Sequence, residues 1–417
     1  MHKTLYVGID VSSKNNTIHC SNANGNPIPI KQKTFPNNLK GAQAIESLLY
    51  HIASQFKFNK IIIGLEATSY YDWHLANFLS QSPKLNSFNP KVFRLNPLQL
   101  NRFRKSLGNI HKTDKVDSSI ITDFLRIGKG LPNPHTPNDP FLPLKRLTRF
   151  RLHLVNNLIR EINTLLHTLF IQFSALTQNK TFSQITSTTS LASIEEFQSP
   201  EEIIQKPIEI IQEFITKKGK NRFKDPKTVA LTLKKAARES YRIKPNLARS
   251  NHFILTQIIR NIRSLKSALK EVDKAIKDEL KAFPNTLTTV PGIGNVLAAG
   301  IIAEIGDINK YSSNDKIAKL AGLVWGRYQS GDFEREEKRL IKGANKYLRY
   351  YLIEAADSVR RNDPVFGEYY WKKYREVSKH QHKRALVLTA RKLVRLIYTL
   401  LSKGAIYQPI IVQNHDS

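Results

Sequence analysis

The stretch TLYVGIDVSSKNNTIHC, residues 4–20, decides the fold of the first part of the chain. Residues 5–10 are rich in apolar and β-branched side chains and predict one strand, and residues 16–20 predict a second. The polar residues between them favour a turn, so we expect the two strands to pair as a hairpin. The turn Asn24-Gly25-Asn26 is expected to lead into a third strand.

Helical and strand-like segments alternate after this hairpin. The expected elements are a helix at about 40–54, a strand at 61–65 followed by Glu66, a helix from about Asp72, a strand at 91–95 and a helix at 113–127. A hairpin followed by such alternation is typical of a mixed sheet flanked by helices. The sequence therefore predicts an α/β domain over residues 1–130.

Beyond this domain the sequence changes to a helical pattern. Five prolines between residues 132 and 143 forbid a continuous helix there and indicate a connection. Two apolar stripes with helical spacing follow, and the second is close to a heptad pattern. The stripes consist of Leu147, Leu154, Leu158, Ile162, Leu165 and Leu169, and of Leu255, Ile258, Ile262, Leu265, Leu269, Val272 and Ile276. We expect an α-helical coiled-coil middle over residues 131–283, with the two helices paired antiparallel or between subunits.

The stretch between the two stripes, about residues 170–250, is first polar and then basic. Residues 217–249 hold 12 lysines and arginines against 2 acids. Such a run is expected either as a solvated, partly helical insertion or as a clamp for nucleic acid, and the sequence leaves both open.

Residues 284–417 are expected to form a mainly α-helical C-terminal domain. Its segment VPGIG at 290–294, followed by apolar residues, has the form of a helix-hairpin-helix element. In such an element the turn, here with Gly292 and Gly294, offers backbone N–H groups to a phosphate. The same short string is also common as an ordinary tight turn.

Further helices are expected at 345–361 and 383–402. Residues 371–403 hold ten lysines and arginines against one acid, which again favours a nucleic-acid partner. Four aromatic residues beside this run are suited to core packing or to stacking on bases, namely Tyr369, Tyr370, Trp371 and Tyr374.

The composition defines the class of partner. The 417 residues carry 65 lysines and arginines against 34 acids, a formal net charge of +31. A folded chain with this charge is expected to bind a polyanion, and nucleic acid is the first candidate. The single cysteine, Cys20, excludes an internal disulfide and a cysteine-based zinc module, and it fits a reducing cytoplasm. The N-terminus has no apolar signal core and no apolar run is long enough for a bilayer, so neither secretion nor membrane insertion is expected.

Four acids of the predicted N-terminal domain are candidate metal ligands. Asp10 lies within the first strand and Glu66 ends the strand at 61–65, so both are expected at ends of the sheet. Asp114 and Asp117 lie three residues apart at the start of a helix, on one helical face. If the sheet brings these carboxylates together, Mg²⁺ or Mn²⁺ would relieve their mutual repulsion most simply. Taken singly, each acid also has a structural explanation, such as the preference of acids for a first helical turn.

Six segments together resemble a known family, the DEDD transposases of the IS-one-ten (IS110) insertion sequences, which are relatives of the Piv-type DNA invertases. The segments are YVGIDVSSKNNTIHC, IIIGLEATSYYDWHL, NPLQLNRFRKSLGNIHKTDKVDSSIITDFL, VPGIGNVLAAGIIAEIG, AGLVWGRYQSG and IKGANKYLRYYLIEAA. The resemblance covers roughly residues 4–130 and 284–405 in the same order, whereas residues 180–250 match nothing in it.

The resemblance implies a fold and a set of partners. It implies a RuvC-like, RNase H-type N-terminal domain with its acidic tetrad on Asp10, Glu66, Asp114 and Asp117, and it implies a catalytic serine at Ser330 in a C-terminal transposase domain. It further implies double-stranded donor and target DNA, a structured non-coding bridge RNA that guides the enzyme by base pairing, and a homodimer or tetramer that shares active sites between subunits. A cytoplasmic, nucleoid-associated enzyme of a prokaryote is expected.

Ser330 is the only serine within residues 314–357, so the assignment by resemblance is unambiguous. Without the family, a turn serine before a glycine would be the plainer interpretation. Residues 332–339 depart from the family, because they carry four acids where small and basic residues are expected. Candidate contacts to nucleic acid are Arg102, Arg104, Lys105, Lys112, Gly292, Gly294, Arg335, Arg339 and Lys342.

The resulting hypothesis is a recombinase in which Ser330 attacks a DNA phosphodiester while the four acids hold Mg²⁺. Because a covalent phosphoserine would conserve the energy of the broken bond, no ATP-binding motif is needed, and the sequence has no G-x-x-x-x-G-K-[ST]. Two alternatives remain open. One is a metal-dependent nuclease or junction resolvase that activates water, and the other is a non-catalytic nucleic-acid-binding protein.

Overall fold

The structure of the protein is a computed structural model, and it describes residues 3–67, 69–108, 114–178, 181–325, 329–330, 333–334, 340 and 344–409. The side chains of residues 114–115, 329–330 and 333–334 lie outside the description. The chain divides into two compact units, Met1–Pro140 and Phe141–Ser417.

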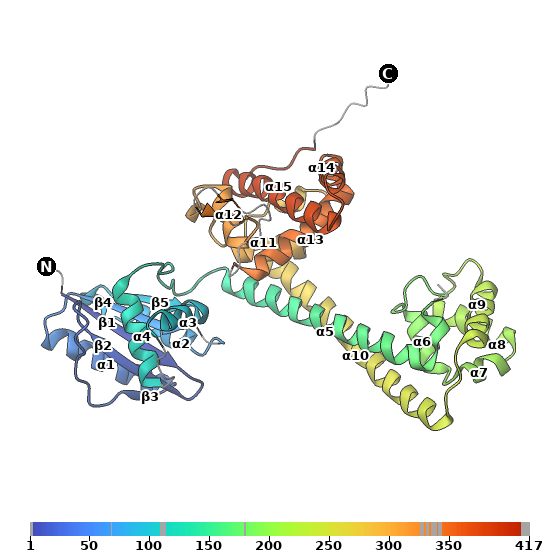
Figure 1. Cartoon of the computed structure of the whole chain (residues 1–417), viewed down its shortest axis with the longest axis horizontal. Coiled ribbons are helices and arrows are strands. Elements are labelled where there is room, and N and C mark those ends of the chain that lie inside the picture. The colour runs from blue at the N-terminus through green and yellow to red at the C-terminus, as the bar shows by residue number, and fades with distance from the viewer. Residues whose placement is uncertain are drawn as a thin grey trace, which may run out of the picture. The chain divides into compact units, whose positions relative to one another are not determined.

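A mixed five-stranded sheet forms the centre of the first unit, with the strand order β3-β2-β1-β4-β5 (Figure 1). The strands are β1 (Thr4–Val11), β2 (Asn15–Ser21), β3 (Thr34–Pro36), β4 (Lys60–Glu66) and β5 (Lys91–Leu95). The first three pair antiparallel, whereas β4 runs parallel to both β1 and β5. The predicted α/β domain and its opening hairpin are confirmed. The third strand starts later than expected, at Thr34, and directly after the turn the structure has an isolated bridge between Ser21 and Pro27.

Helices cover both faces of this sheet. The helices α1 (Leu39–Gln55) and α2 (Trp73–Ser80) pack on one face, where Ile45 and Leu79 join Val7 and Ile63 in one apolar cluster. The opposite face carries α4 (Asp114–Ile127), beside α3 (Pro97–Ser106), and Figure 1 shows α4 lying across the strands. Both faces are therefore buried, as expected for a sheet with parallel central strands.

Two glycines let α4 approach the sheet closely. Gly8 of β1 and Gly64 of β4 are direct partners in the parallel ladder. A Cβ atom at Gly8 would lie 2.6 Å from the backbone nitrogen of Thr122, and one at Gly64 would lie 2.8 Å from Leu125 Cδ1. His19, which pairs with Gly8 in β2, adds a 3.1 Å hydrogen bond between its Nδ1 and the Thr122 hydroxyl. Any side chain at the two glycine positions would push α4 away from the strands.

The second unit contains two long helices, α5 (Leu142–Gln172) at its start and α10 (Pro245–Leu280) further along the chain, which lie side by side (Figure 1). They run antiparallel, because the end of α5 and the start of α10 share one apolar core through Leu165 and Leu255. The start of α5 and the end of α10 share another core, through Leu144 and Ile276. The predicted helix pairing within the chain is therefore present.

The basic stretch between these two helices is folded. It forms α6 (Thr188–Glu196), α7 (Pro200–Gln205), α8 (Ile208–Gly219) and α9 (Pro226–Glu239). Apolar side chains of these helices, such as Ile211 and Leu233, are fully buried in the apolar core that they share with residues of α5 and α10. We call α6–α9, together with the adjoining ends of α5 and α10, the middle helical bundle.

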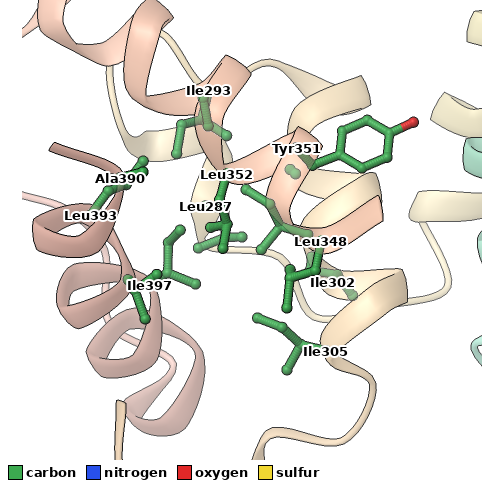
Figure 2. Close-up of a cluster of buried hydrophobic side chains, with 14 of the residues drawn as sticks. Leu287, Ile293, Ile302, Ile305, Leu348, Tyr351, Leu352, Ala390, Leu393 and Ile397 are labelled. Atoms are coloured by element: carbon green, nitrogen blue, oxygen red, sulfur yellow. The ribbon is translucent and has the colours of Figure 1, made fainter. Parts of the chain in front are cut away.

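The C-terminal helices of the second unit pack around the core that also contains Leu144 of α5 and Ile276 of α10 (Figure 2). Tyr351 is fully buried in it and packs where Gly300 leaves room for its ring. Figure 2 shows the Tyr351 hydroxyl pointing away from the labelled aliphatic side chains, and this hydroxyl donates a 2.7 Å hydrogen bond to the carbonyl of Thr148 in α5. The helices are α11 (Asn295–Ile305), α12 (Asn314–Ala321), α13 (Lys346–Asn362), α14 (Pro364–Arg375) and α15 (Gln381–Lys403).

Short elements complete the fold. They are the two-residue strands β6 (Gln329–Ser330) and β7 (Phe333–Glu334) and the 3-10 helices η1 (Asn86–Phe88), η2 (Ser174–Leu176), η3 (Leu287–Thr289) and η4 (Ile308–Lys310). Of the aromatic residues in α14, Tyr370 is buried, whereas Trp371 is exposed. Within the described residues, no helix combines the length and the apolar composition needed to cross a membrane.

We predict that Gly8→Ala weakens the packing of α4 on the sheet. The added methyl group would overlap the backbone of α4, and overpacking of this kind costs about 1–3 kcal/mol. Hydrogen exchange should be faster at the α4 amides, because the free energy needed to open the helix locally falls by this amount. Gly294→Ala is the control, because a Cβ at Gly294 would meet nothing within 4 Å. Unchanged protection of α4 in Gly8→Ala would contradict the prediction.

Candidate active site

Asp10 and Glu66 lie side by side on one face of the sheet. Ile9 and Leu65 are partners in the parallel β1–β4 ladder, so the next residue of each strand stands at the same level. Side chains alternate along a strand, and Asp10 and Glu66 are each two residues beyond a glycine that faces α4. Both carboxylates therefore point to the α4 face, near the carboxyl ends of adjacent parallel strands. Both residues are partly buried.

The N-terminus of α4 lies at this same end of the strands. Ser118 and Thr122 pack over Gly8, whereas Arg126 reaches Gly25, which follows β2 at the opposite end of β1. The helix therefore runs antiparallel to β1, and its first turn lies at the end of β1 that carries Asp10. Asp117 sits in that first turn with only 6% of its surface exposed. Asp114 is the first residue of the helix, but its side chain lies outside the described atoms.

Arg104 of α3 faces Asp117. The helix α3 starts where Asn96 accepts a hydrogen bond from the backbone of Leu98 and Pro97 takes the first helical position. Its Arg104 places Nη2 at 3.2 Å from Oδ1 of Asp117, with both side chains mostly buried. Neither Asp117 Oδ1 nor Arg104 Nε makes a hydrogen bond to a described atom, so hydrogen-bonding capacity remains at this pair.

The structure thus separates the basic residues predicted to bind nucleic acid. Arg102 and Lys105 are exposed on α3, as a contact to a phosphate backbone would require. Arg104 instead turns toward Asp117. We call Asp10, Glu66 and Asp117, at this end of the strands, the acidic edge. Four further residues predicted to bind nucleic acid lie outside the described part of the chain, namely Lys112, Arg335, Arg339 and Lys342.

The acidic edge fits a hard divalent cation by its chemistry. Carboxylate oxygens are the ligands that Mg²⁺ and Mn²⁺ prefer, and Asp117 Oδ1 is a buried oxygen that lacks a described hydrogen bond. The described side chains contain no closed group of three metal ligands as they stand. In this arrangement the guanidinium of Arg104 supplies the positive charge nearest to Asp117. Burial lowers the pKa of His19, which favours its neutral form beside Thr122.

Ser330 lies in a hairpin of the second unit. It is the last residue of β6 and pairs with Phe333 of β7, so two residues separate the strands. An isolated antiparallel bridge also joins Trp325 to Leu340, which precede and follow this hairpin in the sequence. Ser330 is therefore a strand residue beside the turn of a hairpin, and not only a turn residue before glycine.

Both ends of the segment that carries this hairpin are fixed to the first turn of α13. Before the hairpin, Gly322 ends α12 with φ +67, and Arg349 donates a 2.9 Å hydrogen bond to the carbonyl of Ala321. After the hairpin, the Asn345 side chain caps α13 by accepting hydrogen bonds from the backbone of Tyr347 and Leu348.

A buried ion pair holds this cap in turn. The Asn345 amide donates a 2.8 Å hydrogen bond to Glu304 of α11, whose side chain is fully buried. Arg149 of α5 binds the same carboxylate through two hydrogen bonds of 2.6 and 2.8 Å. The Arg149 guanidinium also lies 4.3 Å from the ring centre of Tyr347. The only local sequence signal for this network is Asn345 before a predicted helix.

The predicted phosphate-binding turn has two different glycines. Gly292 has φ +94, and a Cβ there would lie 2.9 Å from the carbonyl oxygen of Ser358 in α13. Backbone conformation and close packing therefore suffice to explain why residue 292 is a glycine. Gly294 is the exposed N-cap of α11 and faces open space. Only this second position leaves a helix N-terminus accessible to an anion.

Comparison with known proteins assigns the chain to a family. Residues 7–173 match the family model of the IS110-type DEDD transposases, whose description is "Transposase". Residues 285–371 match a second model, that of the transposase IS116/IS110/IS902 family. The chain belongs to this transposase family. It is therefore an enzyme of DNA transposition and recombination.

Individual relatives agree with the transposase family. The chain is 24% identical over 317 residues to the insertion element IS116 44.8 kDa protein of Streptomyces clavuligerus, covering 74% of this chain and 76% of the relative. It is 26% identical to the insertion element IS900 42 kDa protein of Mycobacterium paratuberculosis, covering 72% and 73%. It is also 22% identical to the pilin gene-inverting protein of Moraxella bovis, over 97% of both chains.

The two matched segments of this transposase contain all five candidate catalytic residues. Asp10, Glu66, Asp114 and Asp117 lie in the first segment, and Ser330 lies in the second. Residues 174–284, which include the helices α6–α9, lie outside both matches.

We predict that Arg104 and Asp117 are energetically coupled. Arg104→Met should lower the free energy of unfolding by about 3–5 kcal/mol, because it leaves a buried carboxylate without its counter-charge. The double variant Arg104→Met/Asp117→Asn should recover part of this loss, with a coupling energy of about 0.5–3 kcal/mol. Urea unfolding of the metal-free protein measures both.

Arg102→Met is the matched control, because Arg102 is an exposed arginine of the same helix. Its effect should stay within about 0.5 kcal/mol. If Arg104→Met behaves like Arg102→Met, the proposed pairing is wrong.

Proposed function

We propose that this transposase cuts and rejoins DNA through a covalent phosphoserine at Ser330, beside a divalent cation held by Asp10, Glu66, Asp114 and Asp117. The observation that supports it most is the placement of Asp10 and Glu66 at one level and on one face, at the end where α4 begins. The proposal includes a RuvC-like, RNase H-type domain for residues 1–130, which the mixed strand order of the sheet supports.

The chemistry divides between the two units. The Ser330 hydroxyl forms a new phosphoester bond as the bond between phosphorus and the leaving deoxyribose oxygen breaks, so the number of phosphoester bonds is unchanged. The hydroxyl proton passes to a basic oxygen, and the leaving oxygen takes up a proton or remains charged next to positive groups. Asp10, Glu66, Asp114 and Asp117 would hold a Mg²⁺, which would supply Lewis-acid stabilisation of this charge. The second half-reaction is the reverse attack by the partner DNA end.

The proposal assigns parts to three segments of the chain. Residues 1–130 carry the acids, and residues 284–417 carry the serine hairpin, which α13 fixes through Arg349 and Asn345. Residues 131–283 join them through the α5–α10 pair, whose apolar seam supports a short antiparallel coiled coil. We further propose that the acids and the serine of one active site come from different subunits of a dimer or tetramer.

Sequence choice in this proposal comes from a bridge RNA that pairs with donor and target DNA. The protein then needs only to hold nucleic-acid backbones, which is what a net charge of +31 supports. The exposed Arg102 and Lys105 and the open Gly294 turn are suited to such backbone contacts.

A second candidate is a metal-dependent nuclease that activates water and never forms a covalent link. The observation in its favour is that all four acids belong to one compact unit, whereas Ser330 belongs to the other. The two candidates differ in whether DNA stays attached to the denatured protein.

We predict that Ser330→Ala abolishes the covalent protein–DNA product. Labelled substrate DNA is incubated with protein and Mg²⁺ and analysed on a denaturing gel. Ser378→Ala, an exposed serine between α14 and α15, should form the product at the parental rate. Asp10→Asn should reduce product formation by at least about 100-fold, as expected for loss of a metal-organising group. An adduct in Ser330→Ala disproves the nucleophile, and cleavage without any adduct favours the nuclease.

We predict that a discrete structured RNA copurifies with the transposase. Base pairing can set the target only if one RNA species occupies the protein, whereas electrostatic attraction alone binds RNA without selection. Sequencing the RNA recovered after washing at high salt tests this. Recovery of bulk cellular RNA with no dominant species would contradict the bridge RNA.

A further inference from the structure

The middle helical bundle separates its charges along the chain. Its first helices carry the acids Glu195, Glu196, Glu201, Glu202, Glu209 and Glu213. From residue 217 onward the sign reverses, with 12 lysines and arginines against 2 acids up to residue 249. A solvated helical surface normally mixes both signs, so this separation calls for a partner.

The strongest part of the basic stretch is the connection between α8 and α9. Six cations gather at the end of α8, in the loop and at the start of α9, and all six are exposed. We call them the basic tip, and they are Lys217, Lys218, Lys220, Arg222, Lys224 and Lys227. The single acid among them, Asp225, is used as the N-cap of α9, where it accepts a 3.0 Å hydrogen bond from the backbone of Thr228.

The salt bridges found in the described part of the bundle involve cations outside the basic tip. Glu202 pairs with Lys206, Glu201 with Arg242, and Glu195 with Arg263. None of these described ion pairs includes a residue of the basic tip. Within the described residues, the ammonium of Lys218 lies over the ring of Phe214, 5.7 Å from its centre. Three of the six acids named above, Glu195, Glu201 and Glu202, are therefore paired with cations outside the basic tip.

The backbone holds the basic tip in a fixed turn. Lys220 and Asn221 adopt the left-handed conformation in succession, with φ of +52 and +57. Phe223 packs against the bundle core and so close to Gly219 that a Cβ there would lie 2.5 Å from its ring. A lysine with φ above zero costs conformational energy, and such positions gather at functional sites. The charges are thus presented by an ordered turn and not by a loose tail.

We propose that the basic tip binds the phosphate backbone of duplex DNA, without reading sequence, at a place separate from the cleaved bonds. Duplex DNA is the substrate class of a transposase, and its closely spaced phosphates attract a cluster of exposed cations. No residue of the tip itself, 217–227, is among the exposed large apolar side chains of the described chain, and the nearest in sequence are Ile210 and Leu231 of the flanking helices. The tip therefore offers charge and not apolar surface, which suits a phosphate backbone.

This contact is a property of this chain beyond the family segments, because residues 174–284 lie outside both family matches. It rests on the transposase membership and not on the proposed serine chemistry. Binding without Mg²⁺ therefore tests it independently.

The test uses the full chain with Lys217, Lys218, Lys224 and Lys227 changed to Gln, which leaves the strained Lys220 untouched. Binding of a 30-base-pair duplex of random sequence is measured by fluorescence anisotropy in EDTA at four salt concentrations. The slope of log K against log salt should become shallower by about 3–4, at about 0.9 for each phosphate that the variant no longer neutralises. Either half of the variant, Lys217/Lys218 or Lys224/Lys227, should give about half of this change.

The matched control changes Lys270, Lys274, Lys277 and Lys281 to Gln. These exposed lysines of α10 and its C-cap lie among acids such as Asp278, so their removal should change the slope by less than about 1. Thermal unfolding confirms that each variant is folded. An unchanged slope in the tip variant, or a weakening confined to duplex RNA of equal length, overturns the proposal.

Discussion

The close packing of α4 on the sheet is the constraint on which the acidic edge depends. Gly8 and Gly64 are neighbours in adjacent strands, and together they form a flat patch without side chains. A helix that lies this close brings its first turn within reach of residues two positions further along the same strands. Those residues are Asp10 and Glu66, so this packing contact places the turn that carries Asp117 at the end of the strands where both acids lie.

The second unit shows a similar dependence on a few buried polar contacts. The hairpin that carries Ser330 is fixed at both ends to α13, and its C-terminal end depends on Asn345, Glu304 and Arg149. A fully buried carboxylate is costly unless its charge and hydrogen bonds are satisfied. Glu304 meets this condition through Arg149 and Asn345, which join α5, α11 and α13 at one point. The long helix α5 is thereby linked to the segment that carries the serine.

Much of the fold was predictable because it follows from local patterns. The strand β5 matches the predicted residues 91–95, because an apolar run between turn residues leaves little choice. The third strand was placed too early, since Pro27 and Pro29 follow the turn and cannot donate to a ladder. The helix α3 was missed although Asn96 and Pro97 form a start signal.

The candidate site was predictable only in part. The level and face of Asp10 and Glu66 follow from strand periodicity once the register is known, and the glycine two residues before each acid was an available signal. The turn of Arg104 toward Asp117 was not predictable, because it depends on how α3 packs beside α4. The pairing of Arg149 with Glu304, 155 residues apart, has no local signature at all.

The most direct test of this account is the position of a bound divalent cation. Crystals of the protein grown with Mn²⁺ would show it by anomalous scattering. The account predicts a peak at about 2.1 Å from carboxylate oxygens of both Asp10 and Asp117, at the end of the sheet where α4 begins. Manganese bound elsewhere, with none between these two residues, would contradict it.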